Sequence, residues 1–362
     1  MALRVHTADC RTFQLGQEAL VRVLVTGGTG FTGSHTVRAL VAAGHDVRLL
    51  VRDPAKVRRV FEPDGFVPDD VVVGDMTDEA SVGAALAGCD GVVHTAALVD
   101  LRRSAARRVE EVNARGVELV IGGAARRGVP SIVHVSSLGV FFVPGGPPLA
   151  PELPIAHGTT AYARSKVHAE VYVRRLQEQG APIRISYPAG IFGPDDPGLS
   201  AAIAGFSTWA TAVLVTSSGL SVVDVRDLAA LHVKLLELPP GEHRYAASAP
   251  MLSWTEVHAV VERLTGRRIR RLRIPGSFMR AIGSVGDALK HLHDFDYPLT
   301  RDAMEFTTRW PGADARRTTE ELGVEFRDPA DTFRDTLIWM YRSGKLTAAQ
   351  IGELAGVTEA AQ

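Results

Sequence analysis

A glycine-rich loop between two regular elements constrains this chain more than any other feature. The largely apolar run VRVLVT at 21–26 predicts a strand, and residues 32–43 predict a helix. Between them, Gly27, Gly30 and Gly33 follow Thr26 at the spacing G-x-x-G-x-x-G. Such glycines permit a tight turn, close approach of the backbone to a ligand and close helix–strand packing, and the helix N-terminus favours negative charge. The loop therefore predicts a cradle for the phosphates of a dinucleotide.

Strand-like and helix-like segments then alternate along the first half of the chain. Further strands are expected at 45–51, 70–75, 91–97, 131–137 and 182–188, with helices at 78–87, 104–127 and 160–179. Strands that are apolar throughout and separated by helices indicate a parallel sheet covered on both faces. We therefore predict an α/β protein with a doubly wound parallel sheet (Rossmann fold) and a smaller C-terminal substrate-binding region. Its ligands should lie beyond the carboxyl ends of the strands.

The domain organisation follows from where this alternation stops. The expected segments are an N-terminal extension at 1–20, a dinucleotide-binding Rossmann domain at 21–188, a mainly substrate-binding cap at 189–345 that is interleaved with the sheet, and a tail at 346–362. The Gly/Pro-rich loop after Ala189 ends the regular pattern. Within the cap, residues 222–238 predict a helix.

Composition excludes several classes of function. The 362 residues are 46% hydrophobic and 22% charged with a net charge of -1, so no global field recruits nucleic acid. The two cysteines are too few for a disulfide framework, which fits a cytoplasmic location. The histidines show no metal-ligand spacing, and we predict no metal. The uncharged stretch 198–223 is interrupted by Gly, Pro, Ser and Thr, so we predict no membrane span.

The end of the second predicted strand bears on which dinucleotide is bound. Many NAD sites place an acid there to accept the ribose hydroxyls, whereas this chain has Val51 followed by Arg52, with Lys56 close behind. The planar fork of an arginine suits a 2′-phosphate. We therefore predict NADP. NAD is the alternative, with Asp53 as the acid that binds the ribose.

Tyr162 and Lys166 form a Y-x-x-x-K pair within a predicted helix. Positions i and i+4 share one helix face, so both side chains can reach one pocket. A nearby ammonium lowers the pKa of a tyrosine from about 10 toward working pH, and such a tyrosine can exchange a proton with a carbonyl or alcohol oxygen. The segment HVSS ends the fifth predicted strand, which offers Ser137, or alternatively Ser136, as a second hydroxyl.

The order of these motifs resembles the extended branch of the short-chain dehydrogenase/reductase superfamily, the NAD(P)-dependent epimerase/dehydratase family. The resemblance implies that Ser137 polarises the substrate oxygen, that Tyr162 is the acid/base, and that Lys166 lowers its pKa and binds the nicotinamide ribose. The segments GDMTD (74–78), HTAAL (94–98) and ISYPAGIFGPDDP (185–197) also match family motifs. The implied cofactor-binding residues are Thr26, Gly27, Gly30, Phe31, Thr32, Gly33, Arg52, Lys56, Asp75, Met76, Ala96, Ala97, Tyr162, Lys166, Pro188, Ala189 and Ile191.

Two further segments stay open at this stage. Asn113 lies inside a predicted helix, where asparagine is intrinsically unfavourable. It either positions a water or backbone group at the site or makes a purely structural hydrogen bond. The basic run TGRRIRRLRIP at 265–275 is either a solvated edge strand or an anion-recruiting segment.

Within the branch, LLVRDPAKV and the Tyr–Lys pair most resemble dihydroflavonol 4-reductase-like and 3β-hydroxysteroid dehydrogenase-like enzymes. We expect an NADP-dependent oxidoreductase that transfers a hydride between nicotinamide and the carbonyl or alcohol carbon of a small apolar substrate. A sugar-nucleotide epimerase or dehydratase is the first alternative, and a non-catalytic dinucleotide-sensing regulator is the second. The resemblance also implies a homodimer formed through the helices at 104–127 and 160–179.

Overall fold

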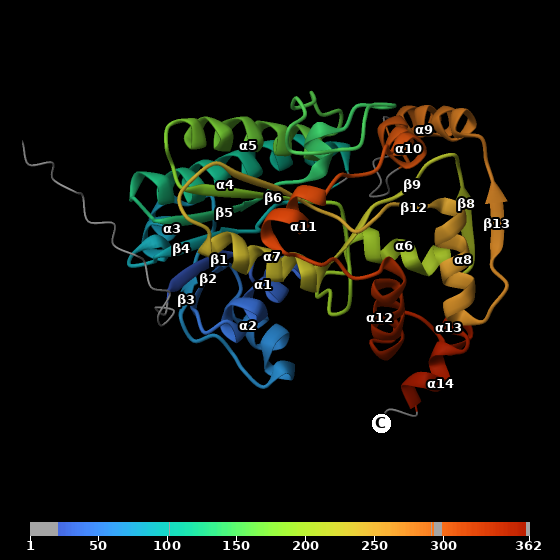
Figure 1. The fold of residues 1–362 in the computed structure, drawn as a ribbon, viewed down its shortest axis with the longest axis horizontal. Helices are drawn as coiled ribbons and strands as arrows, with labels where there is room; N and C mark the ends of the chain where they lie inside the picture. The colour runs from blue at the N-terminus through green and yellow to red at the C-terminus, as the bar shows by residue number, and fades with distance from the viewer. Residues whose placement is uncertain (1–20, 101, 291, 293–298, 360–362) are drawn as a thin grey trace, which may run out of the picture.

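The computed structural model describes residues 21–100, 102–290, 292 and 299–359. The predicted N-terminal extension and the last three residues of the predicted tail lie outside the described residues. In the described part, a large sheet with helices on both faces forms one side of the molecule, and smaller sheets and helices form the other (Figure 1).

The main sheet has seven strands, all parallel, in the order β11-β6-β5-β4-β1-β2-β3. These strands are β1 (Arg22–Thr26), β2 (Asp46–Val51), β3 (Val71–Val73), β4 (Gly91–His94), β5 (Ser131–Val135), β6 (Ile183–Pro188) and β11 (His243–Ala247). The chain winds outward from β1 to β3 and then returns to place β4 beside β1. Because the strand order reverses there, a crevice for ligands is expected between the carboxyl ends of β1 and β4.

Helices cover both faces of this sheet. They are α1 (Phe31–Ala42), α2 (Pro54–Phe61), α3 (Glu79–Leu86), α4 (Ala106–Arg126), α5 (Ala161–Glu178), α7 (Val225–Glu237) and α11 (Arg316–Leu322), with 3₁₀ turns η1 (Glu62–Asp64), η2 (Arg103–Ala105) and η3 (Leu138–Phe141). One apolar core lies under α3, α4 and α5, and a second lies under α1, α2 and α7. The central strands β4, β5 and β6 are buried along their whole length, whereas the edge strands β3 and β11 are partly exposed.

The smaller region contains three two-stranded sheets and a third core. Its elements are β7 (Gly190–Phe192), α6 (Ala201–Trp209), β8 (Ala212–Val215), β9 (Gly219–Leu220), β10 (Val222–Asp224), β12 (Leu252–Ser253), α8 (Trp254–Thr265), β13 (Arg270–Arg273), α9 (Gly276–Lys290), α10 (Arg301–Arg309), α12 (Pro329–Arg342), α13 (Ala348–Ile351) and α14 (Leu354–Glu359). Aromatic side chains dominate the third core, where Phe192, Phe206 and Phe333 meet edge to face.

Two expectations about elements need correction. The segment 222–238 is not helical throughout: Val222–Asp224 pairs with β7 as a strand, and the helix begins at Val225 because the Asp224 carboxylate caps its first turn at the Arg226 amide. In addition, α2 was not predicted. Its helix start is nevertheless encoded, since Asp53 caps the Ala55 amide and Pro54 occupies the first helical position.

No helix in the described residues combines the length and apolar character needed to cross a bilayer. The uncharged stretch 198–223 divides instead among α6, β8, β9 and the start of β10.

Candidate active site

A cavity of about 840 Å³ lies at the carboxyl ends of the central strands. Every residue that the sequence assigned to the cofactor or to catalysis lines this one cavity, although the residues come from segments far apart in the chain. They are Thr26, Gly27, Gly30, Phe31, Thr32, Gly33, Arg52, Lys56, Asp75, Met76, Ala96, Ala97, Ser137, Tyr162, Lys166, Pro188, Ala189 and Ile191.

The glycine loop has the geometry of a phosphate cradle. Gly27 has φ +75°, and a Cβ there would lie 2.8 Å from the Ala96 backbone. A Cβ on Gly33 would lie 2.1 Å from the Gly27 carbonyl oxygen, so α1 packs against the loop without space for a side chain. Gly30 is different. A Cβ added there would closely approach only the Gly27 carbonyl oxygen, at 3.2 Å, so the side of Gly30 that faces the cavity is open. Gly30 is the N-cap of α1, and no side chain among the described residues caps that terminus, so the first amides of α1 are open to a ligand. A pyrophosphate fits this arrangement.

The residues after β2 differ in what they face. Arg52 is exposed and lines the cavity with Lys56. Burial opposes ionisation of Asp75, but hydrogen bonds from the Thr77 hydroxyl and amide, with a smaller contribution from the charge of Arg52, lower the pKa of Asp75. Asp53 does not line the cavity. Its carboxylate caps α2 and accepts from Arg59 at 3.0 Å. The acid that the NAD alternative requires is therefore engaged elsewhere.

The Tyr162–Lys166 pair lies at the start of α5, one turn apart. The Lys166 ammonium donates to the Val135 carbonyl oxygen at 2.9 Å, at the end of β5, and lies 6.0 Å from the centroid of the Tyr162 ring. Burial lowers the pKa of Lys166 to about 8, against an opposing effect of Glu170. Lys166 is thus still mainly cationic at neutral pH.

The pKa of Tyr162 departs from expectation. We predicted that the ammonium would lower it toward working pH, whereas burial raises the pKa of Tyr162 to about 12. Desolvation of a phenolate in this pocket exceeds the effect of an ammonium that is itself bonded to a backbone carbonyl. In the structure, Tyr162 is therefore a protonated phenol at neutral pH.

Both candidate serines border the cavity, but their hydroxyls are engaged differently. Ser136 is buried, and its hydroxyl donates to the Glu170 carboxylate at 2.7 Å. Ser137 is half-buried, lines the cavity, and its oxygen accepts from the Gly139 amide at 3.1 Å. Because that bond uses only an acceptor site, the Ser137 hydroxyl proton remains available to a ligand.

Glu170 was missed by the sequence analysis. It is fully buried and accepts from Ser136, from the Tyr187 hydroxyl at 2.6 Å and from Arg174 at 2.6 Å. It follows Lys166 by four residues, so it lies on the same face of α5 as the Tyr–Lys pair. The repeated spacing of four residues from Tyr162 to Lys166 to Glu170 is the sequence signal that could have identified it.

Further cavity residues also went unpredicted. Leu98 and Val99 follow β4, and Arg108 and Val112 lie one turn apart on α4. Asn113 holds this segment: its amide accepts from the Leu98 N–H at 2.7 Å and donates to the Leu98 carbonyl at 3.0 Å. Asn113 thus contacts the backbone next to the cavity, and these bonds fit both the positioning role and the structural role that the sequence left open.

A pair of buried histidines lies in the strands next to the site. His94 and His134 are register partners on β4 and β5 and stack with their centroids 5.8 Å apart. A hydrogen bond of 2.7 Å joins His94 Nδ1 to the Thr26 hydroxyl. Burial, with the charge of Lys166, lowers the pKa of His94 to about 3 and that of His134 well below its usual value, so both rings are neutral.

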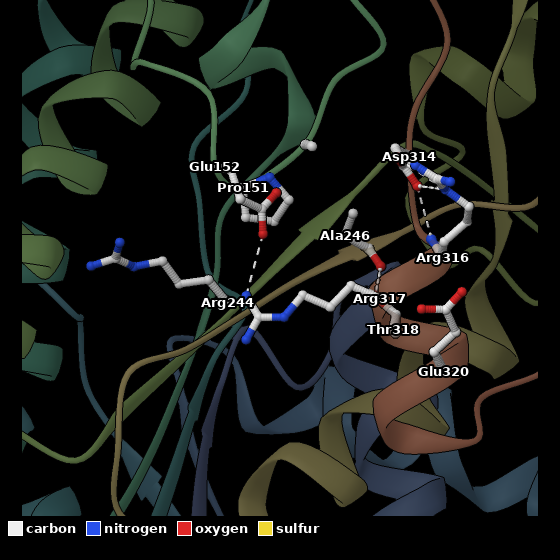
Figure 2. A pocket seen from close by; sticks show the side chains of 10 residues that line it. Pro151, Glu152, Arg244, Ala246, Asp314, Arg316, Arg317, Thr318 and Glu320 are labelled. Atoms are coloured by element: carbon white, nitrogen blue, oxygen red, sulfur yellow. Dashed lines mark hydrogen bonds and ion pairs between the residues drawn. The ribbon is translucent and has the colours of Figure 1, made fainter.

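A second cavity of about 330 Å³ lies at the edge strand β11, between the loop at 150–152 and α11 (Figure 2). Figure 2 shows Arg316 turned toward Asp314, and Arg317 bonded to Glu152 across the cavity. The charges that line it neutralise one another, and it contains none of the predicted site residues. No group of His, Cys, Asp and Glu within the described ranges has the arrangement of a metal site.

Comparison with known proteins places this geometry in a family. The model of the NAD dependent epimerase/dehydratase family matches residues 23–246. The chain belongs to this family. The predicted membership of the extended short-chain dehydrogenase/reductase superfamily is thereby confirmed. The family segment contains the glycine loop, Ser137, Tyr162 and Lys166, and reaches to β11.

Relatives and solved structures agree with this assignment. The chain is 29% identical to sterol demethylase protein B of Methylococcus capsulatus over 89% of this chain and 99% of that protein. It is 27% identical to a putative dihydroflavonol 4-reductase of Synechocystis, over 88% of this chain and 94% of that protein. It is also 29% identical to a 3 beta-hydroxysteroid dehydrogenase/Delta 5-->4-isomerase of Mycobacterium tuberculosis, over 77% of this chain and 79% of that protein. The crystal structure of gox2253 superimposes with a TM-score of 0.77 at 25% identity, covering 90% of this chain and 99% of that one.

The expected fold class is confirmed by the same comparisons. UDP-glucose 4-epimerase from Bifidobacterium longum, solved with NAD+ and UDP, shares the fold with a TM-score of 0.69 at 22% identity, over 89% of this chain and 99% of that one.

Proposed function

We propose that the protein is an NADP-dependent oxidoreductase that acts on the carbonyl or alcohol carbon of a small apolar molecule, with Tyr162 as the acid/base. The observation that carries the proposal is the convergence of Ser137, Tyr162 and Lys166 on the cavity that also contains the glycine loop. When bound, the nicotinamide ring supplies or accepts the hydride. The protein's residues orient the reactants and handle the proton.

Each part of the cavity has a defined task in this proposal. The amides at the start of α1 hold the pyrophosphate, and Arg52 with Lys56 binds the 2′-phosphate that distinguishes NADP from NAD. The Lys166 ammonium holds the nicotinamide ribose and keeps positive charge beside Tyr162.

The proton chemistry favours the reductive direction at neutral pH. The Tyr162 phenol, whose pKa burial raises to about 12, is protonated and can donate to a carbonyl oxygen that becomes an alcohol. The Ser137 hydroxyl polarises the same oxygen. Substrate class is supported by the apolar side chains Leu98, Val99, Val112 and Ile191 in the cavity wall.

The test is turnover by Tyr162→Phe. With NADPH and a panel of apolar ketones and aldehydes, we expect the wild-type chain to oxidise NADPH and the variant to lose about 10²–10⁴-fold in kcat. NADPH binding by the variant should remain within a few-fold of wild type. Tyr172→Phe is the matched control, because Tyr172 lies on the same helix outside the cavity.

Two results would replace the proposal. Turnover of a UDP- or dTDP-sugar with no net change in the cofactor would favour an epimerase. Dinucleotide binding without turnover, unaffected by Tyr162→Phe, would favour a dinucleotide-sensing regulator.

A further inference from the structure

Helix α9 presents its apolar residues to solvent instead of to a core. Phe278, Ile282, Val285 and Leu289 are 59%, 37%, 59% and 47% exposed. Their spacing of four, three and four residues places them on one side of the helix, in a stripe about 16 Å long at 1.5 Å per residue. We call these four residues the α9 stripe. A stripe of this kind normally faces the interior of a globular protein.

The opposite side of α9 is fixed against the segment that precedes α10. A Cβ on Gly283 would lie 2.6 Å from the Thr300 carbonyl oxygen, and one on Gly286 would lie 2.1 Å from that of Leu299. Only glycines allow this approach, so the helix cannot rotate to bury the α9 stripe without losing the contact. The close packing of Gly283 and Gly286 against Leu299 and Thr300 therefore fixes the outward orientation of the α9 stripe.

Charged side chains of α9 also turn away from the exposed side. Arg280 pairs with Glu305 on α10 at 3.6 Å, and the Asp287 carboxylate accepts from the Arg301 amide at 3.0 Å. The remaining exposed positions of the helix are Ser277, Ala281 and Ala288. The outer face of α9 consequently carries no charge.

A basic strand leads directly into this helix. Arg270, Arg271 and Arg273 of β13 are exposed, as is Leu272 between them. Within the described residues, none of these three arginines forms an ion pair with a carboxylate. Figure 1 shows β13 at the outer margin of the molecule and α9 immediately after it. The basic run that the sequence left open is thus an edge strand whose arginines have no carboxylate partner in the described part of the chain, and an apolar helix face follows it.

We propose that α9 and β13 form a docking surface for an anionic lipid bilayer, with α9 lying in the interfacial plane. The α9 stripe enters the boundary between headgroups and acyl chains, and the β13 arginines contact anionic headgroups. Charge complementarity favours this occupant over a second copy of the chain. A symmetric contact between two copies uses the same patch on both, and the uncharged outer face of α9 offers no acidic side chain to pair with the arginines of the other copy. The proposal does not depend on the proposed enzymatic function.

The experiment is co-sedimentation of the full-length chain with lipid vesicles. Vesicles of phosphatidylcholine containing about one-third phosphatidylglycerol should retain the protein more strongly than phosphatidylcholine alone, and high salt should weaken the binding. Ile282→Ser with Val285→Ser should abolish binding. Arg270→Glu with Arg271→Glu should lower the vesicle partition coefficient at least about tenfold, since each basic residue near such a surface contributes about fivefold.

Matched controls separate docking from general surface effects. Val73→Ser removes a valine that is 60% exposed on β3, and Arg58→Glu with Arg126→Glu reverses two exposed arginines outside the surface. Both control variants should bind like wild type, and all variants should keep the wild-type melting temperature within a few degrees.

The proposal is overturned if the wild type binds neither vesicle, or if either test variant binds as tightly as wild type. It is also overturned if sedimentation velocity shows a dimer that the Ile282→Ser/Val285→Ser variant dissociates, since the α9 stripe would then be a protein interface.

Discussion

Ser136 and Ser137 show how adjacent residues acquire different tasks. Both residues follow β5 and border the cavity, but the Ser136 hydroxyl donates to the buried Glu170 carboxylate, whereas the Ser137 hydroxyl only accepts a bond from the Gly139 amide. The same residue-scale effect separates Arg52, which lines the cavity, from Asp53, which caps α2.

Lys166 gives a pH prediction. Its pKa is lowered to about 8, so it is an ammonium below that pH and a neutral amine above it. If the ammonium is needed beside Tyr162, kcat/KM for ketone reduction is high below pH 8 and falls as pH rises through about 8. In Lys166→Arg the guanidinium keeps its charge, so the alkaline limb should move to higher pH. An unmoved limb in that variant would assign it to another group.

Arg52 gives a prediction about the dinucleotide. Arg52→Ala should weaken NADP binding about 10–100-fold, because a charge-assisted hydrogen bond contributes about 1.5–3 kcal/mol, and should change NAD binding only a few-fold. Titration with each cofactor measures this. Asp53→Asn is the matched control, and it should affect the stability of α2 without changing the preference. Equal losses for NADP and NAD in Arg52→Ala would refute the role of Arg52.

At the scale of elements, α4 and α5 hold the loops that line the cavity. Asn113 on α4 bonds the Leu98 backbone and also donates to the Ser165 hydroxyl on α5 at 3.0 Å. One buried side chain thus joins two helices to the segment after β4. This tertiary gain exceeds the intrinsic cost of asparagine within a helix.

Asn113→Ala should therefore destabilise the protein and loosen that segment. We expect a loss of about 1–3 kcal/mol in the free energy of unfolding, because the Leu98 backbone groups lose their partner, together with a raised KM for the substrate. Urea denaturation and steady-state kinetics measure the two effects. Ser165→Ala, which removes only one of the three bonds, should cost less. Unchanged stability in Asn113→Ala would contradict the role of Asn113 in holding the Leu98 segment to α4 and α5.

For the whole molecule, charged contacts connect the sheet to the cap. Arg226 bonds both Asp224, at the start of α7, and Asp335 on α12 at 2.8 Å. Asp227 on α7 accepts from the Arg327 backbone amide at 2.7 Å and pairs with its guanidinium. Asp224 and Asp227, at the junction of β10 and α7, therefore also hold α12, and with it the third core.

That third core should be as important to stability as the sheet cores. Phe333 is fully buried among Phe192, Phe206 and Trp209. Phe333→Ala should lower the free energy of unfolding by about 3–5 kcal/mol through lost burial and a residual cavity. Phe278→Ala is the matched control, since Phe278 is exposed on α9 and should change stability by less than about 0.5 kcal/mol. Denaturant unfolding compares them, and equal losses would mean that Phe278 is covered in solution.

Much of the fold and the site was predictable from local patterns. The sheet strands were recognisable as apolar runs, and the glycine loop and the Tyr–Lys pair each lie within one short segment. The rest was not predictable, because α2 has only eight residues and its Asp53-Pro54 start was interpreted as part of a ligand site. The strand Val222–Asp224 was hidden in a helical pattern because its partner, β7, lies about thirty residues earlier in the chain.

The sequence by itself determined the phosphate cradle, the parallel sheet and the four-residue spacing of Tyr162 and Lys166, because backbone geometry and hydrophobic periodicity act over a few residues. Only the tertiary structure decided which serine hydroxyl is bound by the buried Glu170, that burial raises the pKa of Tyr162, and that α9 turns its apolar side outward. Those properties depend on desolvation and on contacts between distant segments, and neither is present in the order of residues along the chain.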